Sequence, residues 1–198
     1  MAIEIACTVT ATKGRKPEYS PKLCIFVKIN PFVEFKYNIR GHLFPYEIIE
    51  TNLDEFEREF VDNFEENSTR KEIFERYLNY LDVLQEICKE DFIQWIDGSF
   101  VTTKSNPNDI DLVSIIPFEI YETHLVLISN ELIAHHARIL YGVDAYIVPN
   151  YPEGHKKHII TQADLIYWKD LFGNTRATNR SKRRFPKGII QLNITTNE

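Results

Sequence analysis

The sequence predicts an α+β fold, in which a mixed sheet is flanked by helices and preceded by an extra N-terminal β unit. Two observations support this class. Apolar residues recur at helical spacing between residues 51 and 89, and short apolar runs alternate with helical stretches from residue 92 to residue 194. A chain of 198 residues is also long enough to bury a sizeable core.

The N-terminal part has the composition of β-strands. Three runs are rich in β-branched and aromatic side chains, and polar or proline-containing stretches separate them. The runs cover residues 3–10, 23–29 and 33–39. We expect a small antiparallel, β-rich extension over residues 1–44. The stretch from Gly41 to Pro45 marks its boundary with a second domain, residues 45–198.

Two helices should follow this boundary. Thr51, with Asp54 three residues later, resembles a capping box that begins the first helix. Its apolar face comprises Leu53, Phe56, Phe60 and Phe64. The second helix should begin at the capping box of Thr69 and Glu72 and extend to about residue 89. Its apolar face comprises Ile73, Tyr77, Leu81, Leu84 and Cys88.

The remaining chain should alternate strands with helices. One long helix over about 119–140 should end at Gly142, because glycine readily adopts the left-handed conformation that terminates helices. A last helix should begin with Thr161 and Asp164 and end at Gly173. The expected strands cover residues 92–96, 110–116, 143–148 and 188–194.

The composition argues against several classes of protein. A net charge of -6 at pH 7 disfavours wholesale electrostatic binding to nucleic acid or to an anionic membrane. Cys7, Cys24 and Cys88 are too scattered for a disulfide framework and are expected to be reduced thiols. The N-terminus shows no secretory signal, and nowhere do eighteen apolar residues run together. We therefore expect a cytoplasmic protein with no membrane partner.

Two aspartates at alternate positions open the strand predicted at 110–116. Alternate residues of a strand face the same side, so Asp109 and Asp111 would repel each other unless a cation or a proton lies between them. The pair is therefore a candidate metal site. Taken alone, Asp-x-Asp is also typical of turns and strand ends, and Asn106-Pro107-Asn108 is itself a turn signal.

More distant residues favour the site over the turn. Gly98 and Ser99 close the preceding strand, nine residues then intervene before Asp109, and Asp144 lies on a later strand. This ordered set resembles the catalytic core of nucleotidyltransferases of the DNA polymerase beta superfamily. Within that superfamily, residues 45–192 are similar to a small bacterial nucleotidyltransferase-like family. The stretches that carry this similarity are residues 51–61, 95–102, 107–112, 142–149 and 186–190.

The resemblance implies a polymerase-beta-type core and a metal-dependent nucleotidyltransferase. Such an enzyme moves a nucleoside monophosphate from an NTP or dNTP to a hydroxyl and releases pyrophosphate. Asp109, Asp111 and Asp144 would be the catalytic residues and would bind two Mg²⁺ or Mn²⁺ ions. Gly98 would let the backbone approach the triphosphate, and the Ser99 hydroxyl would donate to a phosphate oxygen.

Basic residues supply further candidates for nucleotide binding. Six Lys and Arg side chains lie within residues 176–187, and among them Arg176 and Lys187 are candidates for binding a triphosphate or an acceptor nucleic acid. The alternatives are a solvated tail, or a tail that pairs with the acidic helices. Lys104 is a candidate phosphate ligand in the loop, although loop lysines are usually only solvated.

The sequence leaves the acceptor open. It could be a protein side chain, an RNA or DNA end, an antibiotic or another nucleotide. Small nucleotidyltransferases of this superfamily frequently serve bacterial toxin–antitoxin and anti-phage systems, so a partner protein is a further expectation by analogy. The alternative function is that of a non-catalytic module, which binds a partner through the N-terminal strands and the acidic helices.

Overall fold

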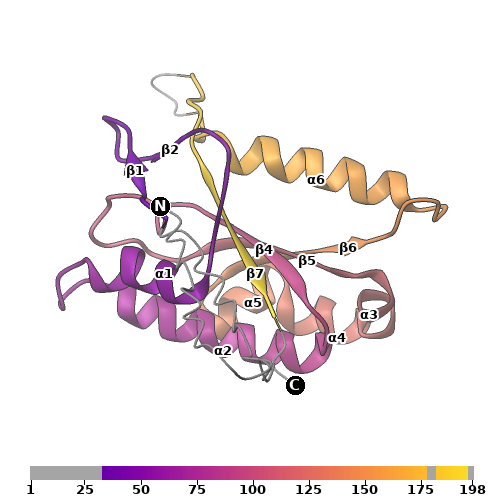
Figure 1. Ribbon diagram of the computed structural model, residues 1–198. Helices are drawn as coiled ribbons and strands as arrows, with labels where there is room; N and C mark the ends of the chain where they lie inside the picture. Colours follow the sequence, from indigo (N-terminus) through magenta and orange to yellow (C-terminus); the bar gives the residue numbers. More distant parts are fainter. Residues whose placement is uncertain (1–32, 178–181, 196–198) are drawn as a thin grey trace, which may run out of the picture. The chain divides into compact units, whose positions relative to one another are not determined.

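The computed structural model describes residues 33–177 and 182–195, and a five-stranded sheet forms its centre (Figure 1). In spatial order the strands are β3 (Ile48–Thr51), β7 (Ile189–Ile194), β4 (Phe92–Asp97), β5 (Asp111–Pro117) and β6 (Asp144–Asn150). The sheet is mixed, because β3 is parallel to β7 and β5 to β6, whereas β4 is antiparallel to both of its neighbours. The predicted α+β class is therefore confirmed.

Helices cover both faces of this sheet. On one face lie α1 (Leu53–Glu57), α2 (Arg70–Cys88) and α5 (Ala134–Tyr141), and on the other lies α6 (His158–Phe172) (Figure 1). The shorter elements are the hairpin strands β1 (Lys36–Tyr37) and β2 (Leu43–Phe44), the π-helical turns η1 (Arg58–Asp62) and η2 (Ile128–Leu132), and the helices α3 (Phe118–Thr123) and α4 (Leu125–Leu127). None of the helices in the described ranges combines the length and the apolar character needed to span a membrane.

Successive residues of the central strands divide between two apolar clusters. Ile96 and Leu112 belong to the larger cluster beneath α2 and α5, whereas their neighbours Trp95 and Val113 pack against α6. This division follows from the two-residue period of a strand, which points adjacent side chains to opposite faces. Because β4 and β5 are buried on both faces, they appear in the sequence as nearly continuous apolar runs.

The helix starts differ from prediction. α1 is capped by Asn52, whose side chain accepts a backbone hydrogen bond in the first turn, because Thr51 still belongs to β3. Thr69 does precede α2, but its hydroxyl donates to the carbonyl of Pro107, so the predicted capping box is not formed. The five residues of the predicted apolar face of α2 are all buried, which confirms that face.

The prediction of one helix over 119–140 is wrong. Ile133 is extended and Ala134 has a φ of 50°, so the chain breaks before α5 and the preceding part divides into α3, α4 and η2. The break also changes the helical phase: Ile128 and Leu132 before it are buried, whereas Ile139 after it is exposed. Gly142, at a left-handed φ of 70°, ends α5 as predicted.

α6 begins at His158, before the predicted start at Thr161. Thr161 is buried instead, where its hydroxyl donates to the carbonyl of Pro149 and accepts from the amide of Tyr151, which links α6 to the end of β6. β6 runs on through Pro149, where the strand was predicted to stop. An edge strand tolerates a proline, because its missing N–H need not serve the ladder.

The predicted N-terminal β unit falls largely outside the described residues. This holds for the strands expected at 3–10 and 23–29, while the run at 33–39 contains the short strand β1. The division of the chain at residue 44 stays a prediction.

Arg70, the first residue of α2, is fully buried and organises the loop between β4 and β5. The Arg70 guanidinium lies over the Phe64 ring, 3.7 Å from the ring centroid. Burial lowers the pKa of Arg70 to about 10, so the group stays charged at neutral pH. Its guanidinium donates, at 2.5–3.2 Å, to the carbonyls of Phe60, Phe100, Thr102 and Lys104. Three of these carbonyls belong to the loop that follows Ser99, so Arg70 fixes its course.

Arg70→Met should lower the free energy of unfolding by about 3 kcal/mol or more, since several backbone carbonyls would lose their donor and each unsatisfied buried group costs about 1–3 kcal/mol. Urea denaturation followed by circular dichroism measures this. Arg76→Met is the matched control, because Arg76 lies on the same helix but is exposed and pairs with Glu72. Equal losses in the two variants would contradict the role given to Arg70.

Candidate active site

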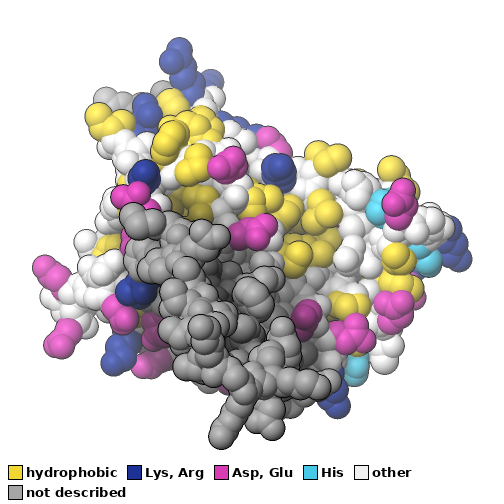
Figure 2. Space-filling view, viewed as in Figure 1, with side chains coloured by type: hydrophobic (Ala, Val, Ile, Leu, Met, Phe, Trp, Pro, Cys, Tyr) yellow, Lys and Arg dark blue, Asp and Glu magenta, His cyan; other side chains and the backbone are white. Residues whose placement is uncertain are grey.

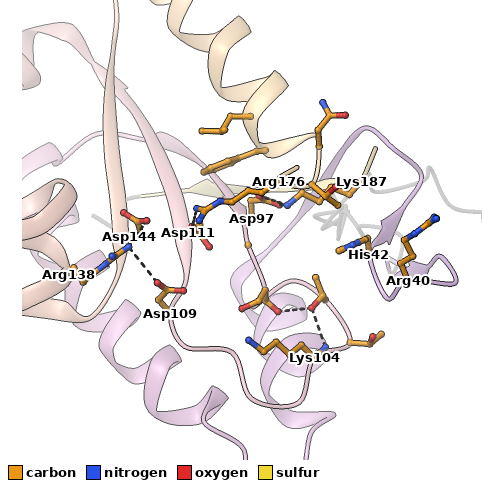
Figure 3. A pocket seen from close by; sticks show the side chains of 18 residues that line it. Arg40, His42, Asp97, Lys104, Asp109, Asp111, Arg138, Asp144, Arg176 and Lys187 are labelled. Atoms are coloured by element: carbon orange, nitrogen blue, oxygen red, sulfur yellow. Dashed lines mark hydrogen bonds and ion pairs between the residues drawn. The ribbon is translucent and has the colours of Figure 1, made fainter. Parts of the chain in front are cut away.

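A cavity of about 700 Å³ opens at the end of β4, β5 and β6 where Asp97, Asp111 and Asp144 lie (Figure 3). All eight residues that the sequence predicted for the site line this cavity. They are Gly98, Ser99, Lys104, Asp109, Asp111, Asp144, Arg176 and Lys187. The hairpin of β1 and β2 contributes Arg40 and His42 to the wall, two residues that the sequence did not indicate.

Carboxylates on three adjacent strands form a row across the cavity. In the strand register, Asp97 of β4 lies opposite Asp111 of β5, and Asp111 lies opposite Asp144 of β6. Neighbouring strands are about 4.8 Å apart, so the three side chains are close neighbours. Asp109 lies two residues before the start of β5 and joins the row from the loop. The structure thus brings the three predicted catalytic aspartates together.

The crowding of negative charge changes the acidity of the central carboxylate. The pKa of Asp111 is raised to about 6, mainly by burial and also by the neighbouring carboxylates Asp109, Asp97 and Asp144. Arg176 acts in the opposite direction. A bound cation would relieve this repulsion, because it favours the charged form of every carboxylate in the row.

Two arginines neutralise part of the row. The Arg138 guanidinium lies 2.7 Å from Asp144 Oδ2 and 3.6 Å from Asp109 Oδ2, and Arg176 lies 3.6 Å from Asp111 Oδ1 (Figure 3). Arg138 was not among the predicted site residues. The only signal for it in the sequence is its place in a helix directly before the strand of Asp144, and a basic residue in a last helical turn is common without any function.

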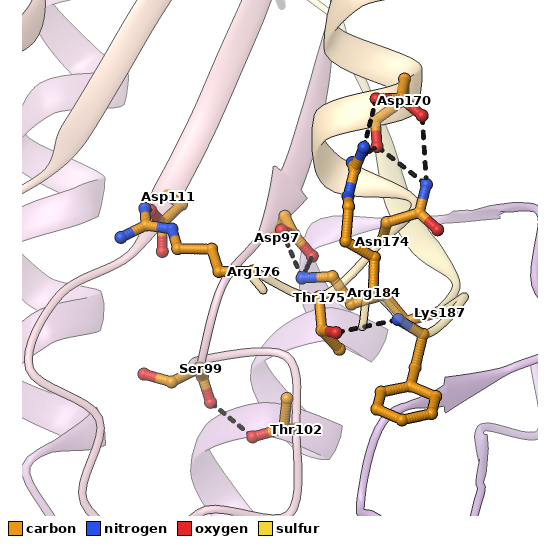
Figure 4. Close-up of polar contacts among 11 residues, drawn as sticks. Asp97, Ser99, Thr102, Asp111, Asp170, Asn174, Thr175, Arg176, Arg184 and Lys187 are labelled. Atoms are coloured by element: carbon orange, nitrogen blue, oxygen red, sulfur yellow. Dashed lines mark hydrogen bonds and ion pairs between the residues drawn. The ribbon is translucent and has the colours of Figure 1, made fainter. Parts of the chain in front are cut away.

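Lys187 has a partner that the sequence did not indicate. Its ammonium donates to both carboxylate oxygens of Asp97 at 2.6 Å, and both side chains are almost completely buried (Figure 4). Burial raises the pKa of the Asp97 carboxyl, and the Lys187 ammonium opposes that shift. The pair joins the end of β4 to the segment that leads into β7.

Backbone hydrogen bonds and a side-chain ion pair hold the described part of the basic segment (residues 176–187) beside the cavity. The amide of Lys187 donates to the carbonyl of Gly173, and the amide of Thr175 donates to the carbonyl of Phe185. Arg184 pairs with Asp170 on α6 at 2.8 Å (Figure 4). In its described part the segment is therefore attached to the end of α6.

Gly98 is required where the turn passes the row of carboxylates. Its φ is 82°, and a Cβ built on it would lie 1.8 Å from Asp111 Oδ2. Any other residue would be strained and would collide with the central carboxylate. The next residue, Ser99, closes the turn through its carbonyl, which accepts from the Thr102 hydroxyl at 2.8 Å.

The donor chemistry of the row fits a hard divalent cation. Mg²⁺ prefers carboxylate oxygens, and Asp109, Asp111 and Asp144 supply them from adjacent positions, with Gly98 leaving the space beside Asp111 open. As the side chains stand, no three His, Cys, Asp or Glu residues of the described chain converge in metal-binding geometry. Asp109 and Asp144 point to Arg138 instead, so binding a metal requires their carboxylates to turn.

Gly98→Ala should destabilise the protein by more than Gly154→Ala. Both glycines have a positive φ, which costs alanine about 1–2 kcal/mol, but nothing lies within 4 Å of a Cβ at Gly154. The clash with Asp111 should add about 1–3 kcal/mol at Gly98 alone. Chemical denaturation of both variants checks this. Equal losses would show that Asp111 moves aside at no cost.

Asp111→Asn should change how stability depends on pH. The folded-state pKa of about 6 exceeds the unfolded value of 3.8, so the folded protein holds a proton between about pH 4 and 6 that the unfolded chain has lost. Wild-type stability should therefore fall as pH rises through this window, by about 2–3 kcal/mol. The free energy of unfolding can be measured by urea denaturation in the presence of a chelator at pH 4 and pH 7. At pH 7, and not at pH 4, Asp111→Asn should be more stable than wild type by about 2–3 kcal/mol. A pH-independent difference would contradict the electrostatic account.

Comparison with known proteins places the chain in a family but gives it no activity. A model for a family of unknown function, DUF6932, matches residues 35–193. No curated protein and no solved structure matches the sequence. The match covers most of the chain, including every residue of the row of carboxylates and all of the five-stranded sheet except the last residue of β7. The protein therefore belongs to the DUF6932 family.

Proposed function

We propose that the protein is a metal-dependent nucleotidyltransferase of the DNA polymerase beta type. It would transfer a nucleoside monophosphate from an NTP or dNTP to a hydroxyl acceptor. One observation carries the proposal: Asp109, Asp111 and Asp144, the catalytic set that the resemblance implies, line one cavity together with the Gly98-Ser99 turn. An accidental Asp-x-Asp in a turn would give no reason for Asp144 to lie in register with Asp111.

The reaction requires an acceptor oxygen to attack the α-phosphorus of the nucleotide. A phosphorus–oxygen bond forms to the acceptor, the bond to the β-phosphate bridging oxygen breaks, and pyrophosphate leaves. Two Mg²⁺ or Mn²⁺ ions, held by Asp109, Asp111 and Asp144, would supply charge neutralisation and a lowered pKa of the acceptor hydroxyl.

The residues around the row can bind and orient the phosphates. Gly98 lets the backbone come close to a phosphate, and the Ser99 hydroxyl can donate to it. Arg176, whose side chain is 88% exposed, and Lys104 offer positive charge at the cavity wall. Lys187 serves a different purpose, because its ammonium is held by Asp97 and positions the strand end that carries Gly98.

The size and fold of the site support the same proposal. A cavity of about 700 Å³ is within the range of about 300–1,000 Å³ usual for small-molecule sites. The carboxylates lie on neighbouring strands of a mixed sheet flanked by helices, which is compatible with a polymerase-beta-type core.

Metal-dependent nucleotide binding and transfer test this function. Purified protein is incubated with Mg²⁺ or Mn²⁺ and each labelled NTP in turn. It should bind the nucleotide and transfer the label to an acceptor, and the protein itself is the first acceptor to examine. Asp111→Asn and Asp144→Asn should reduce transfer by about 100-fold or more, because the metal ligands would be incomplete. Asp82→Asn, an exposed carboxylate on α2, should leave transfer unchanged. No metal-dependent nucleotide binding in the wild type, or full activity in both variants, would overturn the proposal.

A role in binding a partner protein is the second candidate, and the surface of α6 favours it. Several large apolar side chains of this helix are exposed, among them Ile159 at 72%, Ile166 at 69% and Tyr167 at 58%. Figure 2 shows hydrophobic side chains at the surface in the part of the view where Figure 1 draws α6. A helix that is apolar on its outer side as well as its inner side is usually covered. The two roles are separable, because Ile166→Asp would weaken a partner contact and leave the row of carboxylates intact.

A further inference from the structure

We propose that Arg138 is a phosphate-binding residue that exchanges partners, leaving the catalytic carboxylates when the polyphosphate of the nucleotide arrives. The inference rests on the proposed function and names the residue that makes metal binding depend on nucleotide. In the observed arrangement one guanidinium contacts two of the three proposed metal ligands, Asp144 at 2.7 Å and Asp109 at 3.6 Å.

These contacts compete directly with a metal. A carboxylate oxygen that accepts from an arginine is not available to a cation at the same lone pair, and the positive charge of Arg138 also repels a divalent ion. Arg138 must therefore turn away before Asp109 and Asp144 can both serve as ligands. The guanidinium that has turned away can pair with another anion at the cavity, and a nucleotide triphosphate provides one.

Exposure, together with the number of carboxylates contacted, singles out Arg138 as the residue able to exchange. The Lys187–Asp97 pair is 10% and 8% exposed, so breaking it would leave two buried charges, which is costly. Arg138 is 54% exposed although Asp144 is only 15% exposed, so the guanidinium can turn toward solvent when the pair opens. Arg176 is also exposed, but its guanidinium lies only within 3.6 Å of Asp111.

The geometry allows the exchange without movement of the backbone. Arg138 lies in the last turn of α5, which Gly142 terminates, and the amide of Asp144 donates to the carbonyl of Ile110 at 2.9 Å. This bond holds Asp144 beside β5 while the long side chain of Arg138 rotates about its own bonds. A guanidinium presents a planar fork of donors that matches phosphate as well as carboxylate, so the same group can serve both partners.

Linkage then predicts that metal and nucleotide strengthen each other's binding. Each ligand favours the arrangement in which Arg138 has left the carboxylates, so either one lowers the free energy needed to bind the other. With Arg138 neutralised, the metal should bind without help, and the nucleotide should lose a phosphate contact.

Calorimetric titration of the full chain with Mn²⁺, and separately with non-hydrolysable analogues of the four NTPs, tests this. Without nucleotide, Arg138→Gln should bind Mn²⁺ about threefold to tenfold more tightly than wild type, as expected for removing one partly exposed ion pair. In saturating Mn²⁺ it should bind the best wild-type analogue about tenfold more weakly, since a charge-assisted bond to phosphate is lost. Arg138→Lys should lie between the two.

Arg76→Gln is the matched control, because Arg76 is 51% exposed and pairs with a single glutamate away from the cavity. It should leave both affinities unchanged. Tighter Mn²⁺ binding together with weaker nucleotide binding in Arg138→Gln supports the exchange. If wild type binds both ligands but one or both of these shifts are missing in Arg138→Gln, the exchange is overturned and the proposed function stands. If wild type binds neither ligand, the proposed function fails and the exchange with it.

Discussion

The buried guanidinium of Arg70 is the interaction on which the candidate site depends. The loop between β4 and β5 has no regular structure of its own, yet it must place the Gly98 turn at one end and Asp109 at the other. Arg70 gives the loop a fixed course, since its guanidinium binds backbone carbonyls along it. The hydroxyls of Ser68 and Thr69 add bonds to the carbonyls of Ser105 and Pro107. The residues at the start of α2 thus determine the course of the loop through hydrogen bonds to its backbone.

Charge balance is the second constraint on the site. Each carboxylate of the row has a cation beside it, but the pairs differ in how deeply they are buried. The buried pair of Lys187 and Asp97 is a structural connection, because separating it would leave charges without solvent. The more exposed Arg138 and Arg176 neutralise carboxylates that the proposed chemistry requires. Neither arginine is buried in its ion pair as Lys187 is. The same acidic row can therefore be stable in the protein and still be open to other ligands.

The sequence was sufficient for the parts of the structure that depend on local pattern. The runs around Trp95, Val113 and Ile190 predicted strands correctly, because burial on both faces leaves a continuous apolar signal. The predicted site residues also came together, since the interval between Gly98 and Asp109 is a loop joining paired strands.

What the sequence could not predict depends on tertiary contacts. Nothing local distinguishes the buried Arg70 from an ordinary exposed arginine in a first helical turn, and the apolar spacing over 119–140 gave no sign of the break at Ala134. The partners of Lys187 and Arg138 come from other parts of the chain. Lys187 meets Asp97, ninety positions earlier, and Arg138 meets Asp109 across β5, α3, α4 and η2. Such pairs leave no periodic signal.

The position of β7 in the sheet has a consequence for the order of folding. β7 lies between β3 and β4 in the sheet. Its residue Ile189 is paired with Ile48 of β3, although the two residues are far apart in the sequence. Bringing such distant segments together costs loop-closure entropy, so topologies rich in non-local pairs fold slowly. The hairpin of β4 and β5 can form early, but the lysine that secures Asp97 arrives only with the segment leading into β7. A chain in which only this hairpin has formed therefore has Asp97 opposite Asp111 without the lysine that pairs with Asp97.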